Sequence, residues 1–517
     1  MTPKSSNSEL GTRNSERFLK LTSARISQLV FLAAFLVLFV TTDYRGQDEI
    51  SVAVNAFFRA DPLVLVTYML ATLGFTWLLL PGVLMFIFSG VLGRFFCGWI
   101  CPLGTIIDLV TGWIRKTKPL AWLAGNLKYY LLVTLLFAAL FGVNIAGVFD
   151  PIGLLIRFLT FLLYPLLGFA ARQGWVGLYH VLGDNRDSVA GAYSFLKAYI
   201  LPFRETFYPL AFFSLLLFGV IIFLERFERR NWCRNLCPLG TLLGLIGRWS
   251  IFRRLPPRLC SDCGDCKEHC PTAFDQEVFQ KSNCIACMNC VARCRFKRVN
   301  FRPGLTRKPR PAFSPARRVV LTSLVSGFIV SKAFAFRLDS AEKRVLRPPG
   351  VRAEPEFLGK CVRCGECMKV CPRNALYPAS LQAGLYSLFT PVVIPRLGYC
   401  EYNCSLCGQV CPTGAIPKLP LQEKKAAVIG LAVVDKNHCL PYAKKQNCIV
   451  CEEHCPIPEK AIRFESTEEV DYSGRKVTLK KPYVVDKLCN GCGICEYVCP
   501  IEQKAAIEVF PSTPRKR

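Results

Sequence analysis

The segment CVRCGECMKVCP occupies residues 361–372 and contains four cysteines followed by a proline. Its spacing, C-x2-C-x2-C-x3-C-P, is the bacterial cysteine run that binds [4Fe–4S] clusters. Three closely spaced thiolates bind three irons of one cube, and the fourth thiolate crosses to a partner cube. The segment therefore predicts one half of a two-cluster unit that transfers electrons.

This pattern, or a close variant of it, occurs six times and contains 24 of the 28 cysteines. Structural zinc usually uses one or two CxxC pairs, and disulfides do not need this spacing. We therefore expect six [4Fe–4S] clusters with four thiolate ligands each. Quartet by quartet, the expected ligands are Cys260, Cys263, Cys266 and Cys270; Cys284, Cys287, Cys290 and Cys294; Cys361, Cys364, Cys367 and Cys371; Cys400, Cys404, Cys407 and Cys411; Cys439, Cys448, Cys451 and Cys455; and Cys489, Cys492, Cys495 and Cys499.

The remaining cysteines form two copies of the motif C-x3-C-P. They are Cys97, Cys101, Cys233 and Cys237. The two copies belong to an internal repeat, because residues 94–105 and 230–241 share the pattern R-x2-C-x3-C-P-L-G-T. We expect two transmembrane hairpins to deliver these equivalent loops to one face of the membrane.

Proline is favoured at the first helical position, so we expect Cys101 and Cys237 at the N-caps of two helices. There the helix dipole and the nearby Arg94, Arg230 and Arg234 would stabilise a thiolate. The repeat is interpreted as a redox-active or metal-binding thiol site beside the electron path. A buried packing loop made of small residues is the alternative.

Hydrophobic residues make up 52% of the chain, and apolar runs fill residues 1–250. Since a spanning helix needs about 20 residues, we expect a four-helix transmembrane region over residues 1–254. The stretch from Leu63 should begin with a re-entrant or surface helix, and Ile152–Ala171 should be an interfacial or re-entrant helix on the outer side. The expected spans are Ile26–Thr42, Phe75–Phe95, Leu127–Phe149 and Phe207–Leu224.

Clusters of Lys and Arg follow the second and the fourth expected span. The positive-inside rule places these clusters, the N-terminus and the C-x3-C-P pairs on the cytoplasmic side. Residues 255–300 would then form a cytoplasmic two-cluster domain. By the crossing rule, Cys294 completes its first cube and Cys270 its second.

Residues 301–337 contain a basic linker and a fifth apolar run, Val319–Phe336, preceded by Arg317 and Arg318. This pattern resembles a twin-arginine export signal inside the chain. An ordinary fifth span and a buried helix are the alternatives, and residues 333–335 (Ala-Phe-Ala) also fit a cleavage site. We expect residues 338–517, with four quartets, to be periplasmic.

Within residues 338–517 we expect strands over Ala427–Asp435 and a hairpin that turns near Gly474. A nested order of the quartets, first with fourth and second with third, is expected. It assigns the fourth ligands of the four cubes, in chain order, to Cys499, Cys455, Cys411 and Cys371.

The bare chain contains 65 Lys and Arg against 37 Asp and Glu, a formal net charge of +28. Six oxidised cubes, each with four thiolates, would lower this to about +16, so the cations require no nucleic-acid partner. The motif CxxCH does not occur and none of the four His lies in an expected span, so we expect no haem. No acid–base or nucleophile constellation supports hydrolysis.

Residues 20–300 resemble the NapH-type membrane subunit of periplasmic nitrate reduction. The resemblance rests on Gly93–Gly104, Trp232–Gly240 and the cysteines of residues 260–294. The nitrous-oxide reductase regulator NosR and the copper-handling CcoG proteins share this core. Residues 314–517 resemble the NapG/MauM family through the Arg-Arg pair, Leu346–Gly350, the 361–367 run and Cys411–Ala415.

The resemblance implies an α-helical membrane bundle joined to α+β, bacterial-ferredoxin-like [4Fe–4S] domains, one cytoplasmic with two clusters and one with four. It also implies a quinol dehydrogenase-like relay in the bacterial inner membrane. Electrons would leave the quinone pool and pass through the clusters to a periplasmic reductase or cytochrome. Two other functions stay open: a CcoG-type cofactor-assembly or copper reductase acting through the C-x3-C-P thiols, and a NosR-like membrane regulator.

Overall fold

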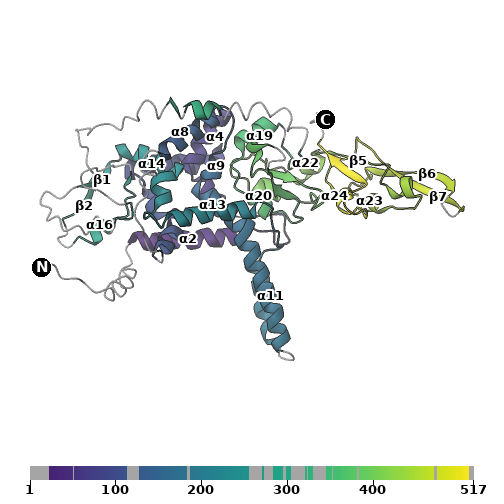
Figure 1. The fold of residues 1–517 in the computed structure, drawn as a ribbon, viewed down its shortest axis with the longest axis horizontal. Coiled ribbons are helices and arrows are strands. Elements are labelled where there is room, and N and C mark those ends of the chain that lie inside the picture. Colours follow the sequence, from purple (N-terminus) through teal and green to yellow (C-terminus); the bar gives the residue numbers. More distant parts are fainter. Residues whose placement is uncertain are drawn as a thin grey trace.

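The computed structural model contains a helical region followed by short two-stranded sheets. It describes residues 23–50, 52–112, 114, 127–182, 187–255, 270–272, 283–294, 298–303, 321–322, 324–329, 345–351, 353–380, 384–470 and 474–511. The described residues between 23 and 249 form the helical region. The 252–303 unit, which comprises residues 252–303, lies at one end of it, and the 345–510 unit, which comprises residues 345–510, lies at the other (Figure 1).

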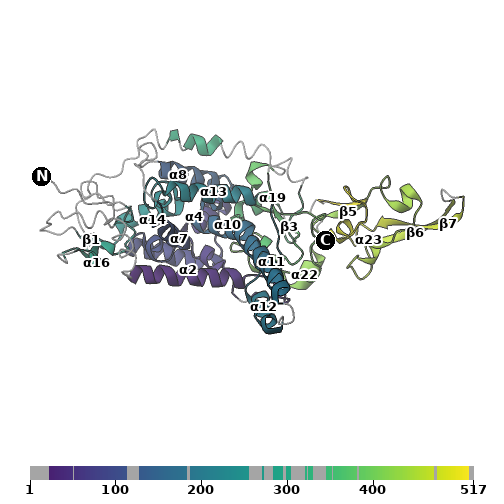
Figure 2. The same ribbon diagram turned by 60° about the horizontal axis from the view of Figure 1, so that its bottom comes forward.

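Helix α2, Ser23–Thr41, runs the length of the helical region, which agrees with the first expected span (Figure 2). Near its start, Gln28 Nε2 donates to the carbonyl oxygen of Gly98, 2.9 Å away. Near its end, the carbonyl oxygen of Phe39 accepts a hydrogen bond from Lys369 Nζ in the 345–510 unit. At 1.5 Å per residue, its 19 residues cover about 28 Å, close to the hydrocarbon thickness of a bilayer.

Residues 53–72 enter and leave the helical region at the same end, as expected of a re-entrant segment. They contain α3, Ala56–Arg59, and α4, Pro62–Thr72. Asn55 Nδ2 donates to the carbonyl oxygen of Val410 in the 345–510 unit, and the backbone of Ala71 lies beside Gly359 of the same unit. The turn between the two helices carries Asp61, which is fully buried.

Two expected spans are shorter in the structure than the sequence suggests. Helix α5 covers only Leu80–Leu92 of the expected Phe75–Phe95, after a 3₁₀ turn at Trp77–Leu79. Helix α8 ends at Leu140 because Gly142, with φ +80°, turns the chain before α9, Ala146–Phe149. Helix α13, Ala211–Leu224, is close to the fourth expected span.

Ile152–Ala171, expected to be an interfacial or re-entrant helix, lies inside the helical region in its first half. Helix α10, Pro151–Phe158, is buried in the helical region, where Phe158 stacks on Phe218 of α13 with ring centroids 4.0 Å apart. A π-helical segment, Leu159–Leu163, continues it into α11, Tyr164–Leu182. Apolar side chains alone do not distinguish contact with lipid from contact with α13.

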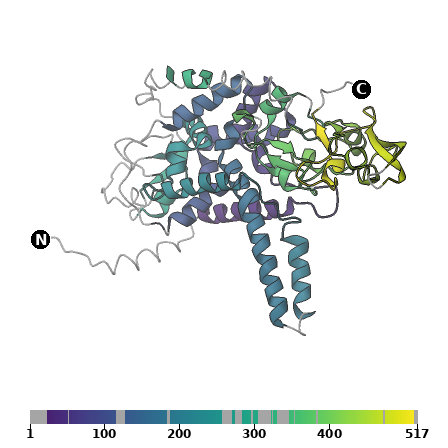
Figure 3. The ribbon, with the colours of Figure 1, turned by 45° about the vertical axis from the view of Figure 1, so that its right-hand side comes forward.

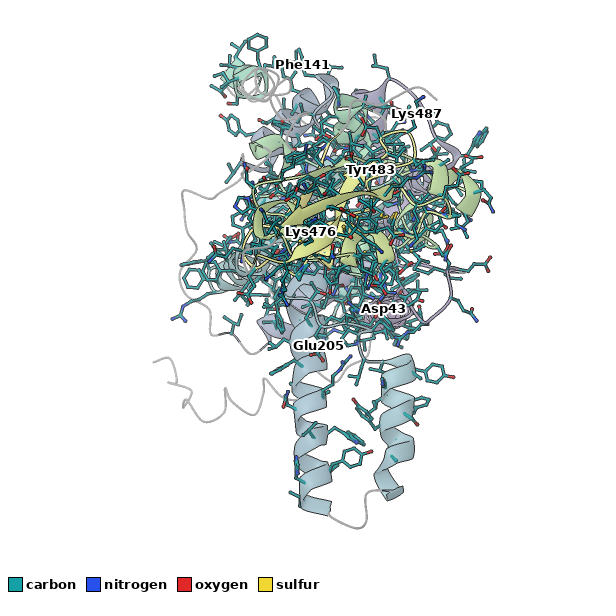
Figure 4. The ribbon with its side chains drawn as sticks, turned by 90° about the vertical axis from the view of Figure 1, so that its right-hand side faces the viewer. Asp43, Phe141, Glu205, Lys476, Tyr483 and Lys487 are labelled. Atoms are coloured by element: carbon teal, nitrogen blue, oxygen red, sulfur yellow. The ribbon has the colours of Figure 1, made fainter. Side chains whose placement is uncertain are left out.

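Helix α11 and helix α12, Asp187–Tyr199, leave the helical region together, crosswise to α2 (Figure 3). Trp175 and Tyr193 stack between the two helices at 5.3 Å. Glu205 lies at the base of this hairpin (Figure 4). Its Oε1 is 2.8 Å from Arg172 Nε of α11. The hairpin of α11 and α12 therefore projects from the helical region.

Two helices among the described residues are long and apolar enough to cross a membrane, Ser23–Thr41 and Pro151–Val181. The fifth expected span, Val319–Phe336, lies largely outside the described residues, as do Arg317, Arg318 and residues 333–335. Its residues 321–322 and 324–329 are helical, and Phe328 packs edge-on against Phe141, just beyond the end of α8.

Each half of the internal repeat contains short helices. The first half contains α6, Phe95–Trp99, and α7, Pro102–Thr111. The second contains a π-helical turn, Trp232–Leu236, then α14, Pro238–Ile246, and a 3₁₀ turn, Gly247–Trp249. Cys101 and Cys237 are the N-caps of α7 and α14, as predicted.

Each cysteine-rich unit is closed by an antiparallel strand pair. Strands β1, Phe252–Leu255, and β2, Asn300–Pro303, enclose the 252–303 unit with α16, Asn289–Ala292. The hairpin β6–β7, Ile462–Val470 with Lys476–Val484, confirms the predicted turn near Gly474. The other strands are β3 Leu376–Pro378, β4 Pro391–Val393, β5 Leu431–Val434 and β8 Ile507–Phe510. The remaining short helices are α19 Glu354–Lys360, α20 Glu366–Lys369, Leu385–Ser387 (3₁₀), α21 Leu406–Gln409, α22 Leu421–Ala426, Leu440–Lys444 (π), α23 Val450–Glu453 and α24 Ile494–Tyr497.

Candidate functional site

Two cavities in the 345–510 unit are each lined by four cysteines. One is lined by Cys361, Cys364, Cys367 and Cys411. The other is lined by Cys439, Cys448, Cys451 and Cys499. In both, three closely spaced cysteines meet a fourth from the next quartet along the chain, which is the arrangement that a [4Fe–4S] cube needs.

The nested order expected from the sequence is therefore wrong. Cys411, not Cys499, joins the 361–367 run, and Cys499, not Cys411, joins the 439–451 run. The physical reason is the pairing of β5 with β8, because these strands flank the third and fourth quartets and close them into one unit. The first two quartets form a separate unit before β5.

The other two groups of thiols follow the same order. Burial raises the pKa of Cys407, and the nearby thiols of Cys400, Cys404 and Cys371 raise it further. Burial likewise raises the pKa of Cys489, with a contribution from the thiol of Cys455. Cys371 therefore belongs with the 400–407 run and Cys455 with the 489–495 run.

The buried thiols of these groups favour their protonated form. Burial raises the pKa of Cys361 to about 11 and that of Cys492 to about 12. Because iron binds the thiolate, loading of these groups must release protons. The pair of quartets before β5 also contacts the pair after β5. The backbone N–H of Cys400 donates to the carbonyl oxygen of Cys492 at 2.9 Å.

The 361–371 loop is pressed against the helical region. Arg157 of α10 donates through Nη1 to the carbonyl oxygens of both Gly147 and Arg363, each 2.7 Å away. A side chain at Gly147 would meet the carbonyl oxygen of Val362, since a Cβ there would lie 1.9 Å from it. The first cysteine group of the 345–510 unit is thus held directly against α9 and α10.

The 252–303 unit contacts the opposite end of the helical region. A Cβ at Gly98 would lie 2.2 Å from the carbonyl oxygen of Ile285, and Trp99 Nε1 donates to the carbonyl oxygen of Ala286 at 3.0 Å. Burial raises the pKa of Cys287 to about 12, with contributions from the thiols of Cys284 and Cys270. Cys270 thus lies with the second quartet, as predicted, whereas Cys260, Cys263 and Cys266 are outside the described residues.

The two C-x3-C-P loops face each other and exchange arginine contacts. Arg94 Nη2 donates to the carbonyl oxygen of Cys233, and Arg230 Nη1 donates to that of Cys97, both at 3.0 Å. Arg230 also forms an ion pair with Asp108, 2.7 Å away. The predicted repeat therefore corresponds to a reciprocal contact between its halves.

The expected stabilisation of thiolates at these N-caps is not found in the chain itself. Burial raises the pKa of Cys101, and the thiols of Cys97 and Cys233 add to that rise. Arg234, one of the three expected cations, pairs instead with Glu228 at 3.0 Å. Removal of the thiols from water outweighs the helix dipole here.

A pair of aspartates in the helical region was not identified from the sequence. Asp61 and Asp150 cap α4 and α10, each followed by proline, and their carboxyl groups are close enough to interact electrostatically. Both residues are fully buried. Because burial disfavours two neighbouring carboxylate charges, the pair favours holding a proton. The signal was present as two Asp-Pro dipeptides that each precede an apolar run.

In comparisons with known proteins, both the C-x3-C-P loops and the cysteine quartets match iron–sulfur families. A family model described as a 4Fe-4S binding domain matches residues 73–120 and 209–258, which contain the C-x3-C-P loops. A model described as a 4Fe-4S dicluster domain matches residues 360–415, the first two quartets of the 345–510 unit. No solved structure matches the chain.

Three relatives cover different shares of the chain. The methylamine utilization ferredoxin-type protein MauM of Methylorubrum extorquens is 36% identical over 208 residues, 38% of this chain and 90% of that protein. The ferredoxin-type protein NapG of Escherichia coli is 40% identical over 168 residues, 32% of this chain and 70% of that protein. The ferredoxin-type protein NapH of Haemophilus influenzae is 26% identical over 297 residues, 54% of this chain and 87% of that protein.

The chain belongs to the NapH/NapG-type polyferredoxins. As a member of this family it is an iron–sulfur protein of electron transfer. In this polyferredoxin the dicluster match and the C-x3-C-P matches lie at opposite ends of the helical region, with Arg157 and Gly98 at the two junctions.

Proposed function

We propose that this polyferredoxin is a quinol dehydrogenase-like relay of the bacterial inner membrane, which passes electrons from the quinone pool to a periplasmic reductase or cytochrome. One observation carries the proposal: cysteine-rich units pack on both ends of a helical region whose helix α2 is about as long as a bilayer's hydrocarbon core is thick. Such a protein has redox sites on both sides of a membrane.

The surface of the helical region supports insertion in a membrane. Soluble monomers rarely expose large contiguous apolar patches. Here large apolar side chains are exposed on α2, α5 and α13, among them Val30, Val37, Ile87, Phe88, Phe212 and Phe223. Lipid would cover these side chains, and the 252–303 unit would lie in the cytoplasm with the 345–510 unit in the periplasm.

The six cysteine quartets are the proposed ligands of six [4Fe–4S] clusters, which when bound accept and donate single electrons. The fit rests on the donor set, because the thiols of two complete groups line one cavity each. The Cys400–Cys492 backbone contact supports electron transfer between the cluster pair before β5 and the cluster pair after it. We propose that the two clusters held between β5 and β8, by the third and fourth quartets of the 345–510 unit, lie nearest to the electron acceptor.

Oxidation of a quinol releases two protons as well as two electrons, so a proton acceptor must lie near the site of oxidation. Asp61 and Asp150 supply adjacent, buried carboxyl groups inside the helical region. Helix α10, which Asp150 caps, also carries Arg157, whose guanidinium contacts the carbonyl oxygen of Arg363 beside Cys364. We propose that quinol is oxidised beside this pair and that the 361–367 thiols hold the first electron acceptor.

The test is reduction of the full-length protein in anaerobic liposomes by a water-soluble quinol, followed by electron paramagnetic resonance. The proposal predicts reduced-cluster signals after quinol alone, and the same signals plus any low-potential ones after dithionite. Reduction by dithionite without any reduction by the quinol would contradict the proposed electron source. Reduction in detergent but not in liposomes would contradict access from the lipid phase.

A further inference from the structure

We propose that Cys97, Cys101, Cys233 and Cys237 together hold one further iron–sulfur cluster, shared by the two halves of the internal repeat. The six quartets leave these four cysteines unassigned, so the cluster would be a seventh. Its existence does not depend on the proposed quinol activity, although its role as a relay does.

The four thiols lie in one buried site. Their residues are 7%, 7%, 9% and 5% exposed, in chain order. All four side chains belong to one buried core cluster, and the Arg94 and Arg230 contacts hold the two loops against each other. Two loops that are 136 residues apart in sequence thus contribute a pair of thiols each.

The loops are held in this position by their own arginines. The Arg94 guanidinium of the first loop donates to the Cys233 carbonyl oxygen of the second, and Arg230 does the same for Cys97. Gly240 makes the approach possible, because a Cβ there would lie 2.4 Å from Arg94 Nη2. The approach is closer in the second copy than in the first, where a Cβ at Gly104 would lie 3.6 Å from Arg230 Nη2.

Neither a disulfide nor a single metal ion accounts for the four thiols. All four cysteines are free. Within the part of the chain that the structure describes, no three His, Cys, Asp or Glu side chains are close enough to hold one metal ion. A cluster places its ligand sulfurs farther apart than a mononuclear ion does, so it fits thiols that share a site without converging on one point.

The surroundings suit the negative charge of a thiolate-ligated cluster. Arg94 and Arg230 are 2% and 0% exposed and lie against the backbone of the cysteine loops. The backbone N–H of Gly240 already donates to Cys237 Sγ at 3.3 Å, at the N-terminus of α14. Buried cations and N–H donors of this kind lower the cost of burying thiolates and tune cluster potentials.

The position is suited to electron transfer with the 252–303 unit. Residues 97–99 carry both a thiol and the contacts with the Ile285 and Ala286 carbonyl groups. The residue after Ala286 is Cys287, a proposed ligand of that unit. A cluster at the repeat would therefore stand between this unit and the helical region.

The test is iron, sulfide and trace-metal analysis of the full-length protein, purified without oxygen. The proposal predicts about two to four iron atoms beyond the roughly 24 that six cubes contain. The quadruple variant with Cys97, Cys101, Cys233 and Cys237 changed to Ser should lose that excess and keep the rest. Cys439→Ser, which removes a ligand from a quartet, is the matched control and should lose iron but keep the seventh cluster's signal in Mössbauer spectra.

Wild-type iron that stops at six cubes would overturn the proposal, and this measurement needs no variant to fold. Stoichiometric copper or zinc that disappears in the quadruple variant would also overturn it, in favour of a mononuclear or copper-handling site. Activity with quinol is not part of this test, so its loss would speak only against the proposed function.

Discussion

Arg157, in α10 of the helical region, donates a hydrogen bond of 2.7 Å to the carbonyl oxygen of Arg363, between two cysteines of the 361–367 run. The same Nη1 atom also binds the carbonyl oxygen of Gly147. One buried guanidinium thus ties the cysteine loop to two segments of the helical region. The contact joins the proposed site of quinol oxidation to the proposed first electron acceptor.

The junction at Gly147 should not tolerate a side chain. Gly147→Ala places a methyl group against the carbonyl oxygen of Val362, at a position 1.9 Å away before any shift. We expect the 345–510 unit to dock less firmly, at a cost of about 1–3 kcal/mol, because overpacked contacts force backbone shifts. Limited proteolysis of the purified protein should release this unit faster. Gly174→Ala, in open space on α11, is the control, and equal proteolysis of both variants would contradict the docking geometry.

The junction at Gly98 offers the corresponding experiment for the 252–303 unit. Gly98→Ala would place a methyl group 2.2 Å from the carbonyl oxygen of Ile285. We expect slower electron exchange between this unit and the rest of the protein, with total iron nearly unchanged, as measured by freeze-quench spectroscopy. Gly90→Ala, which meets only the Ile246 side chain at 4.0 Å, should behave as the wild type. Wild-type rates in Gly98→Ala would show that this contact does not control exchange.

The aspartate pair should matter for quinol and not for artificial reductants. Asp61→Asn or Asp150→Asn keeps the size of the side chain but removes a proton acceptor, so quinol-dependent cluster reduction should fall by about 100-fold. Reduction by dithionite should stay unchanged, since it transfers no quinol proton. The Asp486→Asn variant, at an exposed aspartate, provides a matched control. If all three variants oxidise quinol equally fast, the pair is structural.

The pairing of the quartets is directly testable by loss of ligands. Cys411→Ser and Cys361→Ser should perturb the same cluster signal, because both thiols line one cavity. Cys499→Ser and Cys439→Ser should together perturb a different one. Matching spectra of Cys499→Ser and Cys361→Ser would instead restore the nested order.

The spacing of residues along the sequence was sufficient to predict some structural features and not others. The cysteine runs predicted three of the four thiols that line each cavity, and proline after cysteine predicted the N-caps at Cys101 and Cys237, because both depend on neighbours in sequence. The partner of each run depends on the pairing of β5 with β8, about 75 residues apart, which spacing alone does not reveal. The order of the quartets could therefore not be predicted reliably.

Helix boundaries and buried polar groups show a second limit. The apolar run Leu127–Phe149 gives no sign that Gly142 ends α8 early, because composition averages over such turns. From the sequence, Asp61 and Asp150 are ordinary N-cap residues before proline. Only the fold brings their carboxyl groups together. Burial of α10 against α13 likewise depends on the tertiary structure.

The central claim is that the two cysteine-rich units lie on opposite faces of the membrane, and protease treatment of spheroplasts tests it most directly. Antibodies or tags should follow the 252–303 and 345–510 units separately, before and after lysis. The account predicts that external protease removes the 345–510 unit from intact spheroplasts, whereas the 252–303 unit is cut only after lysis. Protection of both units until lysis would place them on the same, cytoplasmic face and contradict a relay to a periplasmic acceptor.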